Sequence, residues 1–161
     1  HNVSNALAVI AAARKLGISM EQIQAGLLGF SGANRRFQRK GEYNGVTIID
    51  DYAHHPTEIR TTLEAAKNYP NREVWCIFQP HTFTRTKAFF HEFATSLSLA
   101  DHIILADIYA AREKDPGDIS SKMLSDAIPD SRYMGSFEEK WWQLAGGIVL
   151  IVMTFAIIRK K

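Results

Sequence analysis

The chain has 161 residues, enough for one ordinary domain and part of another. Apolar residues make up 46% of it and charged residues 22%, which is typical of globular proteins and excludes a generally disordered chain. A formal net charge of +2 is too small to indicate a nucleic-acid-binding protein, and the basic run RRFQRK is typical of a solvated segment.

The first part of the chain predicts two helices. Residues 1–17 are rich in Ala and Leu, carry Asn and Ser near their start and end at Gly17, which are ordinary helix start and stop signals. Residues 19–30 predict a second short helix with an apolar face. Residues 31–45 are punctuated by glycines and predict a loop or a short hairpin.

From Val46 onward the pattern alternates between strand and helix. Strands are predicted at 46–50, 73–79 and 102–109, and helices at 56–69, 84–100 and 120–128. A short strand at 132–135 and a short helix at 136–144 follow. The apolar runs do not alternate strictly, so both faces of each strand should be covered. The predicted fold is α/β: a Rossmann-like, mostly parallel sheet with helices on both faces, preceded by two helices.

The last residues, 141–161, form an atypical apolar tail that allows two interpretations. Trp141 and Trp142 on one side and three basic residues on the other resemble the flanks of a membrane anchor. However, the apolar stretch 144–158 is shorter than the ~20 residues that a spanning helix needs. We therefore favour a final buried strand at about 148–155 over membrane contact by the tail, which stays the second alternative. A truncated or frameshifted reading frame, or a fusion to an anchor, would also explain this tail.

The cysteine content and the first residues indicate the cellular compartment and the completeness of the chain. The single cysteine, Cys76, cannot form an internal disulfide and lies in the apolar run VWCIF, which favours a buried thiol. This fits a reducing compartment, and we expect a cytoplasmic protein. The first residues lack the pattern of a signal peptide and an initiator methionine, so we expect a piece of a longer protein.

Ionisable residues follow three of the predicted strands, at the point where each strand ends. In a parallel sheet these ends lie at one edge, where ligands bind. The residues are Asp50, Asp51, Tyr52, His54 and His55 after the first strand, His81 and Arg85 after the second, and Arg112 and Glu113 after the third. We expect them to meet there, although the same residues could simply cap helices and form turns.

The residue types at this edge suit a nucleotide and a small carboxylate. Asp51 can accept two hydroxyl hydrogen bonds from a sugar diol. The forked donors of Arg36 and Arg85 suit a phosphate or a carboxylate, and histidines can donate to an anion. No G-x-x-x-x-G-K-[ST] or G-x-G-x-x-G motif is present. His54 and His55 are adjacent and cannot easily face one ion, so no metal site is predicted.

Five segments in order resemble the C-terminal part of a Mur ligase, one of the ATP-dependent enzymes of peptidoglycan synthesis. They are HNVSNALA, FSGANRRFQRKG, DDYAHHPTEI, FQPHTFTRT and DIYAARE, and the similarity runs from His1 to about Glu139. Within the family, the segments resemble the branch that adds L-alanine to UDP-N-acetylmuramate through an acyl phosphate. The resemblance implies that residues 1–31 end a central ATPase domain and that residues 32–161 form the C-terminal domain.

The resemblance also implies ligands and roles. ATP with Mg²⁺, L-alanine and UDP-N-acetylmuramate would be the ligands, with the magnesium ligands and the sugar-nucleotide domain outside this chain. The expected ATP contacts are His1, Asn2, Asn5, Arg36 and Asp51, and the expected amino-acid contacts are Tyr52, His54, His81 and Arg85. No covalent catalyst is expected, and the chain alone should be inactive. The alternative is a non-catalytic nucleotide-binding module, with or without a membrane tether formed by its tail.

Overall fold

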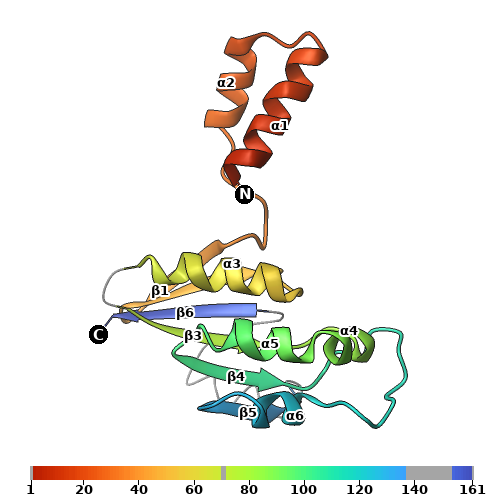
Figure 1. Ribbon diagram of the computed structural model, residues 1–161. Coiled ribbons are helices and arrows are strands. Elements are labelled where there is room, and N and C mark those ends of the chain that lie inside the picture. Colours follow the sequence, from red (N-terminus) through yellow and green to blue (C-terminus); the bar gives the residue numbers. More distant parts are fainter. Residues whose placement is uncertain (1, 70–71, 137–153, 161) are drawn as a thin grey trace. The chain divides into compact units, whose positions relative to one another are not determined.

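The computed structural model describes residues 2–69, 72–136 and 154–160 (Figure 1). The chain divides into two compact units, His1–Ala33 and Asn34–Lys161. None of the described helices is long and apolar enough to cross a membrane.

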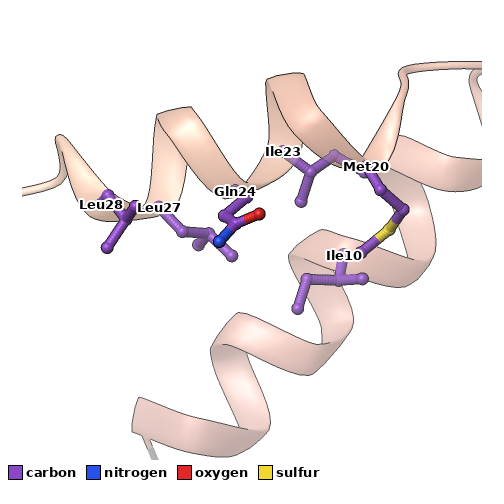
Figure 2. A pocket seen from close by; sticks show the side chains of 6 residues that line it. All are labelled: Ile10, Met20, Ile23, Gln24, Leu27 and Leu28. Carbon is purple, nitrogen blue, oxygen red and sulfur yellow. The ribbon is translucent and has the colours of Figure 1, made fainter.

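The first unit is a pair of helices, α1 (Asn2–Lys15) and α2 (Met20–Leu28). Ser19 begins α2 with a capping box: its hydroxyl accepts the Gln22 N–H at 3.3 Å, and the Gln22 side chain accepts the Ser19 N–H at 3.2 Å. Figure 2 shows an apolar groove between the helices, lined by Ile10, Met20, Ile23, Gln24, Leu27 and Leu28. Large apolar side chains stay exposed on both helices, including Val3, Leu7 and Leu28. Both helices were predicted from the sequence.

The second unit is a six-stranded sheet with the order β1-β2-β6-β3-β4-β5 (Figure 1). The strands are β1 (Gln38–Tyr43), β2 (Val46–Asp51), β3 (Arg72–Phe78), β4 (His102–Ala106), β5 (Ser131–Gly135) and β6 (Thr154–Lys160). β3, β4 and β5 are parallel neighbours, whereas β6 runs antiparallel between β2 and β3. Because β2 and β3 both oppose β6, they point the same way. Four of the strands, β2 to β5, therefore share one direction, as a mostly parallel sheet requires.

The connecting helices are α3 (Pro56–Lys67), α4 (Phe83–Ala88), α5 (Phe90–Leu97) and α6 (Ser121–Asp126). α3 packs beside α5 and α5 beside α6 (Figure 1). Right-handed crossovers that step in one direction along a sheet put their helices on the same face, and these three fit that rule. The helix predicted at 136–144 lies outside the described residues.

The core lies between these helices and the sheet. Val74, Cys76 and Phe78 alternate along β3 and are fully or almost fully buried. Phe78 packs on Phe93 of α5 with ring centroids 5.6 Å apart, and Leu63 of α3 is buried in the same cluster. The buried thiol at Cys76 confirms the sequence prediction, and burial raises its pKa to about 12.

Three predicted elements differ from the observed ones. The single helix predicted at 84–100 is interrupted at Phe89, whose φ of −115° and ψ of 28° separate α4 from α5. β4 ends at Ala106, because the chain then turns to pair Tyr109 with His81. The final strand exists, but at Thr154–Lys160. Its bounds follow from register with β2 and β3, which an apolar pattern does not reveal. Residues 148–153 lie outside the described part.

The hairpin that joins β1 to β2 turns at Asn44 and Gly45, with φ angles of 48° and 77°. Positive φ at both positions is the tight turn that Asn-Gly favours. Gly45→Ala should therefore lower the unfolding free energy by about 1 kcal/mol, measured by urea titration. Gly41→Ala, in the neighbouring strand with open space around a new Cβ, serves as the control and should cost less. Equal effects would contradict this reading of the turn.

Candidate functional site

The carboxyl ends of β2, β3 and β4 lie at one edge of the sheet because the three strands share a direction. The loops that leave these ends, together with the first turn of α3, are called the rim below: residues 51–58, 79–85 and 107–113. Adjacent residues of a strand point to opposite faces, and this separates the two aspartates at the end of β2. Asp50 faces Arg35 and Lys40, with its Oδ2 3.5 Å from Arg35 Nε and 3.7 Å from Lys40 Nζ.

Asp51 is buried, and its carboxylate is occupied by the protein's own backbone. Its Oδ2 accepts the Phe37 N–H at 2.7 Å and its Oδ1 accepts the Ala53 N–H at 2.8 Å. Only 6% of the residue is exposed. Burial raises the pKa of Asp51, although these N–H groups, the Thr62 side chain and the Arg36 charge act against that rise. Asp51 therefore ties the segment before β1 to the loop after β2.

The hydrogen bonds of Asp51 to Phe37 and Ala53 place the neighbouring residue, Arg36, at the rim. Arg36 sits between two residues with left-handed backbone, Arg35 at φ 56° and Phe37 at φ 47°. Non-glycine residues adopt this conformation only where surrounding bonds hold them. Here the Arg35 carbonyl accepts the Tyr52 N–H at 2.7 Å, and the Arg35 guanidinium lies 5.0 Å from the centre of the Tyr52 ring. The Arg36 side chain is 56% exposed and available to a ligand.

Glu58, in the first turn of α3, links Arg36 to His54. Its carboxylate accepts the His54 N–H at 3.1 Å and the His55 N–H at 3.3 Å, which caps α3. The same carboxylate lies 3.6 Å from the Arg36 guanidinium and 3.5 Å from His54 Nδ1. A residue expected at the nucleotide and one expected at the amino acid thus share one anionic partner.

Burial acts to raise the pKa of Glu58, but the N–H groups of His54 and His55 and the charges of His54 and Arg36 outweigh it, so the pKa lies below its ordinary value of 4.5. The folded protein then binds fewer protons than the unfolded chain just below pH 4.5. This contribution to the unfolding free energy is present in full above that pH and is lost as the pH falls through the folded pKa. Glu58→Gln should remove it.

Urea titrations at a series of pH values below neutrality measure this effect. The matched control is Glu64→Gln, an exposed position on the same helix. If both variants reduce the acid-induced loss of unfolding free energy equally, the charge contacts of Glu58 are not its cause.

His81 lies beside His54, with ring centroids 6.5 Å apart. Arg85, one turn further along the chain, reaches His81 Nδ1 with its NH1 at 3.5 Å. Burial lowers the pKa of His81, and the positive charges of Arg85 and His54 lower it further. His81 is therefore kept neutral beside a permanent cation, and the pair offers N–H donors suited to a carboxylate.

The loop after β4 holds the His81 loop in position. The Thr82 N–H donates to the Tyr109 carbonyl at 2.9 Å, and the Tyr109 N–H donates to the Pro80 carbonyl at 2.8 Å. Glu113 accepts the Thr84 N–H at 2.9 Å and also the Thr84 hydroxyl. Thr82 has a φ of 69°, a strained value for a β-branched residue. These bonds hold that strain and fix the direction of His81.

The structure therefore brings together most of the predicted site residues of the second unit. Arg36, Asp51, Tyr52, His54, His81 and Arg85 all lie on or directly beside the rim, linked by the contacts above. Arg112 is exposed and is not drawn into them. Asn2 and Asn5 belong to α1 in the first unit, and His1 lies outside the described residues. Within the described part of the chain, no cluster of three His, Cys, Asp or Glu side chains could hold a metal ion.

Two rim residues escaped the sequence analysis. Glu58 stands three residues after His55 and directly follows P-T, so the spacing of a capping box was visible. Tyr109 was assigned to a strand, whereas it pairs with His81 as an isolated bridge, and the two rings are tilted with their centroids 5.5 Å apart. No local pattern marks that second contact, because it joins residues 28 positions apart.

A mostly parallel α/β sheet with convergent polar loops beyond its strand ends defines a Rossmann-like ligand-binding domain. The sequence matches the Mur ligase, glutamate ligase domain over residues 35–147. The chain therefore belongs to the Mur ligase family, as its motifs indicated.

The curated relatives that the chain matches include UDP-N-acetylmuramate–L-alanine ligases. That of Lachnoclostridium phytofermentans is 55% identical over 143 residues, and that of Lachnospira eligens 57% identical over 143 residues. In each case 86% of this chain is covered, but only 30% and 31% of the relative's length. The chain thus spans less than a third of these relatives.

Two solved structures are similar in fold. A murein peptide ligase from Psychrobacter arcticus 273-4 is 30% identical with a TM-score of 0.63, and the match covers 91% of this chain and 31% of that one. A bifunctional folylpolyglutamate synthase/dihydrofolate synthase from Yersinia pestis is 20% identical with a TM-score of 0.55, covering 81% of this chain and 29% of the other. The second likeness concerns the fold alone.

Proposed function

We propose that this chain is the C-terminal part of an ATP-dependent ligase that joins L-alanine to UDP-N-acetylmuramate in the cytoplasm, during peptidoglycan synthesis. The observation that carries the proposal is the convergence of His54, His81 and Arg85 at one strand edge in a chain 55–58% identical to alanine-adding ligases. In this reaction ATP converts the muramyl carboxylate to an acyl phosphate, and the amine of alanine displaces the phosphate.

The amino-acid part of the site would be formed by Tyr52, His54, His81 and Arg85. Arg85 and the neutral His81 can hold the carboxylate of alanine, since one is a permanent cation and the other an N–H donor. Tyr52 packs edge-on against His54, with ring centroids 5.3 Å apart, and would border the methyl group. These side chains would act by positioning the nucleophile and by electrostatic stabilisation.

The nucleotide part would use Arg36 for a phosphate and Asp51 at the ribose. The 56% exposure of the Arg36 side chain supports its role. The burial of Asp51 supports an indirect role, in which it aims Arg36 through the Phe37 N–H. His1, Asn2 and Asn5 would approach the adenine. Magnesium would be held by residues outside the described part of this chain, which offers no cluster of metal-ligating side chains.

The first unit would complete a central ATPase domain. Two helices alone cannot bury a core, and large apolar side chains such as Val3, Leu16 and Phe30 remain 68–79% exposed. Exposed apolar surface of this kind marks an interaction site. The apolar groove in Figure 2 would then face the rest of that domain.

The test is an assay of ADP release by the full-length parent protein, or by this chain joined to the upstream domains of a 55–58% identical relative. ADP release should require UDP-N-acetylmuramate and an amino acid together, and glycine and serine are compared with L-alanine. The 161-residue chain alone, which lacks a phosphate-loop motif, is the control and should release none. Nucleotide binding without any amino-acid-dependent turnover would instead support a non-catalytic module.

A further inference from the structure

Two of the rim histidines, His54 and His81, carry their hydrogens on opposite ring nitrogens. His54 Nδ1 lies 2.9 Å from the Tyr52 carbonyl oxygen. A carbonyl can only accept, so His54 Nδ1 must carry a hydrogen. The neutral His54 ring therefore presents the lone pair of Nε2, on the side of the ring away from that bond.

His81 has the reverse arrangement. Its Nδ1 faces the Arg85 guanidinium at 3.5 Å, and a guanidinium can only donate. The Nδ1 of His81 must therefore keep its lone pair, and its hydrogen lies on Nε2. One ring of the pair thus offers an acceptor to a ligand, while the other offers a donor.

Glu58 lies beside the Nδ1 atom of His54. Its Oε2 lies 3.5 Å from His54 Nδ1, on the same side of the ring as the Tyr52 carbonyl. A carboxylate behind a histidine holds the ring in one tautomer and stabilises the imidazolium when the outer nitrogen takes a proton. The charged or titratable groups described around His54 are Tyr52, whose ring packs on it, Glu58 and, through it, Arg36, and across the rim His81 and Arg85.

We propose that His54 Nε2 accepts the proton that the ammonium group of the incoming amino acid must lose, and that Glu58 is the positioning residue behind it; this rests on the function proposed above. An ammonium nitrogen has no lone pair, so it cannot attack a carbonyl carbon until a proton leaves. The two rings need different tautomers because they serve different groups of the amino acid. The ammonium group requires an acceptor, which is His54 Nε2, and the carboxylate requires a donor, which is the Nε2–H of His81.

One ammonium N–H bond breaks as the Nε2–H bond forms, giving an imidazolium and a free amine. The amine nitrogen forms a bond to the acyl carbon, and the C–O bond to the phosphate breaks with its electron pair going to the phosphate. After the attack, the amine nitrogen still carries one proton more than the amide product, and the departing phosphate takes it. The imidazolium of His54 then releases its own proton to solvent.

The first experiment examines the 161-residue chain by nitrogen-15 NMR, which reports the protonated nitrogen of each histidine ring without any turnover. At a pH where the rings are neutral, the hydrogen of His54 should be on Nδ1 and that of His81 on Nε2. If His54 carries its hydrogen on Nε2, no acceptor faces the ligand and the proposal is overturned.

The second experiment uses the full-length enzyme with two amines: alanine, which is protonated at neutral pH, and hydroxylamine, which is largely uncharged there. His54→Gln should slow the alanine reaction by about 10²–10⁴-fold, while hydroxamate formation from the acyl phosphate stays near the wild-type rate. Raising the pH towards the point where free alanine loses its own proton should recover part of the loss. Equal losses with both amines, or no recovery at high pH, would overturn the proposal.

Glu58→Gln keeps an acceptor oxygen for the α3 cap but removes the charge, so it should slow alanine transfer by about 10-fold or more and spare hydroxylamine. The control is His55→Asn. His55 caps α3 by accepting the Thr57 N–H at 3.3 Å and packs on Phe89, and Asn preserves a cap. His55→Asn should affect neither amine. If the wild-type enzyme forms no hydroxamate at all, the proposed function itself fails, which is a separate outcome.

Discussion

Replacing Asp51 by alanine is expected to lower the unfolding free energy of the second unit by about 3 kcal/mol. The carboxylate accepts the N–H groups of Phe37 and Ala53, at 2.7 and 2.8 Å. Alanine has no acceptor, so both donors would lose their partner in a part of the structure where Ala53 is fully buried. Each unsatisfied buried donor costs about 1–3 kcal/mol. Urea denaturation of the purified chain measures the difference.

Asp50→Asn is the matched control, one position earlier in the same strand. Asp50 is as buried as Asp51, at 4% exposed against 6%. However, its Oδ1 accepts no hydrogen bond from the described residues, and its Oδ2 makes only long contacts with Arg35 and Lys40. We therefore expect a clearly smaller loss of unfolding free energy than for Asp51→Ala. If Asp50→Asn lowers the unfolding free energy as much as Asp51→Ala does, the hydrogen bonds of Asp51 to Phe37 and Ala53 are not what stabilises this edge of the sheet.

Arg85→Ala is expected to raise the KM for L-alanine in the full-length enzyme by about 10–150-fold, because loss of a hydrogen bond to a charged group costs ~1.5–3 kcal/mol. The KM for ATP should stay close to its original value, since Arg85 contacts His81, whereas the nucleotide contacts proposed above are Arg36 and Asp51. Steady-state kinetics with each substrate varied in turn separates the two effects.

Two further variants define the Arg85 contact. Arg85→Lys keeps the charge but loses the forked donor, so it should fall between the wild type and Arg85→Ala. Arg112→Ala removes an exposed arginine from the neighbouring loop and should change neither KM. Equal rises in the KM values for alanine and ATP would contradict the assignment of Arg85 to the amino acid.

The sequence predicted the site at the level of strand ends but not at the level of atoms. Strand direction follows from the alternation of strands and helices, and it correctly placed His54 and His81 at one edge. The sequence alone does not distinguish the roles of the adjacent aspartates, Asp50 and Asp51. Only the pleat of β2 assigns Asp51 to the side of Phe37 and Ala53 and Asp50 to the side of Arg35 and Lys40.

Local sequence patterns also could not predict contacts between residues that lie far apart in the chain. Glu113 was noticed as a rim residue, but its hydrogen bonds to Thr84 depend on how two loops of different strands lie together. The position of β6 has the same character. An apolar tail predicts a strand, whereas insertion between β2 and β3 depends on the hydrogen-bonding partners those strands leave open.

The most direct check on this account is a crystal structure of the full-length enzyme with the alanine-bearing product, UDP-N-acetylmuramoyl-L-alanine. The alanyl carboxylate should lie within hydrogen-bonding distance of Arg85 and of the Nε2 of His81, with the new amide nitrogen facing the Nε2 of His54. A product whose alanyl group lies away from all three side chains would contradict the account.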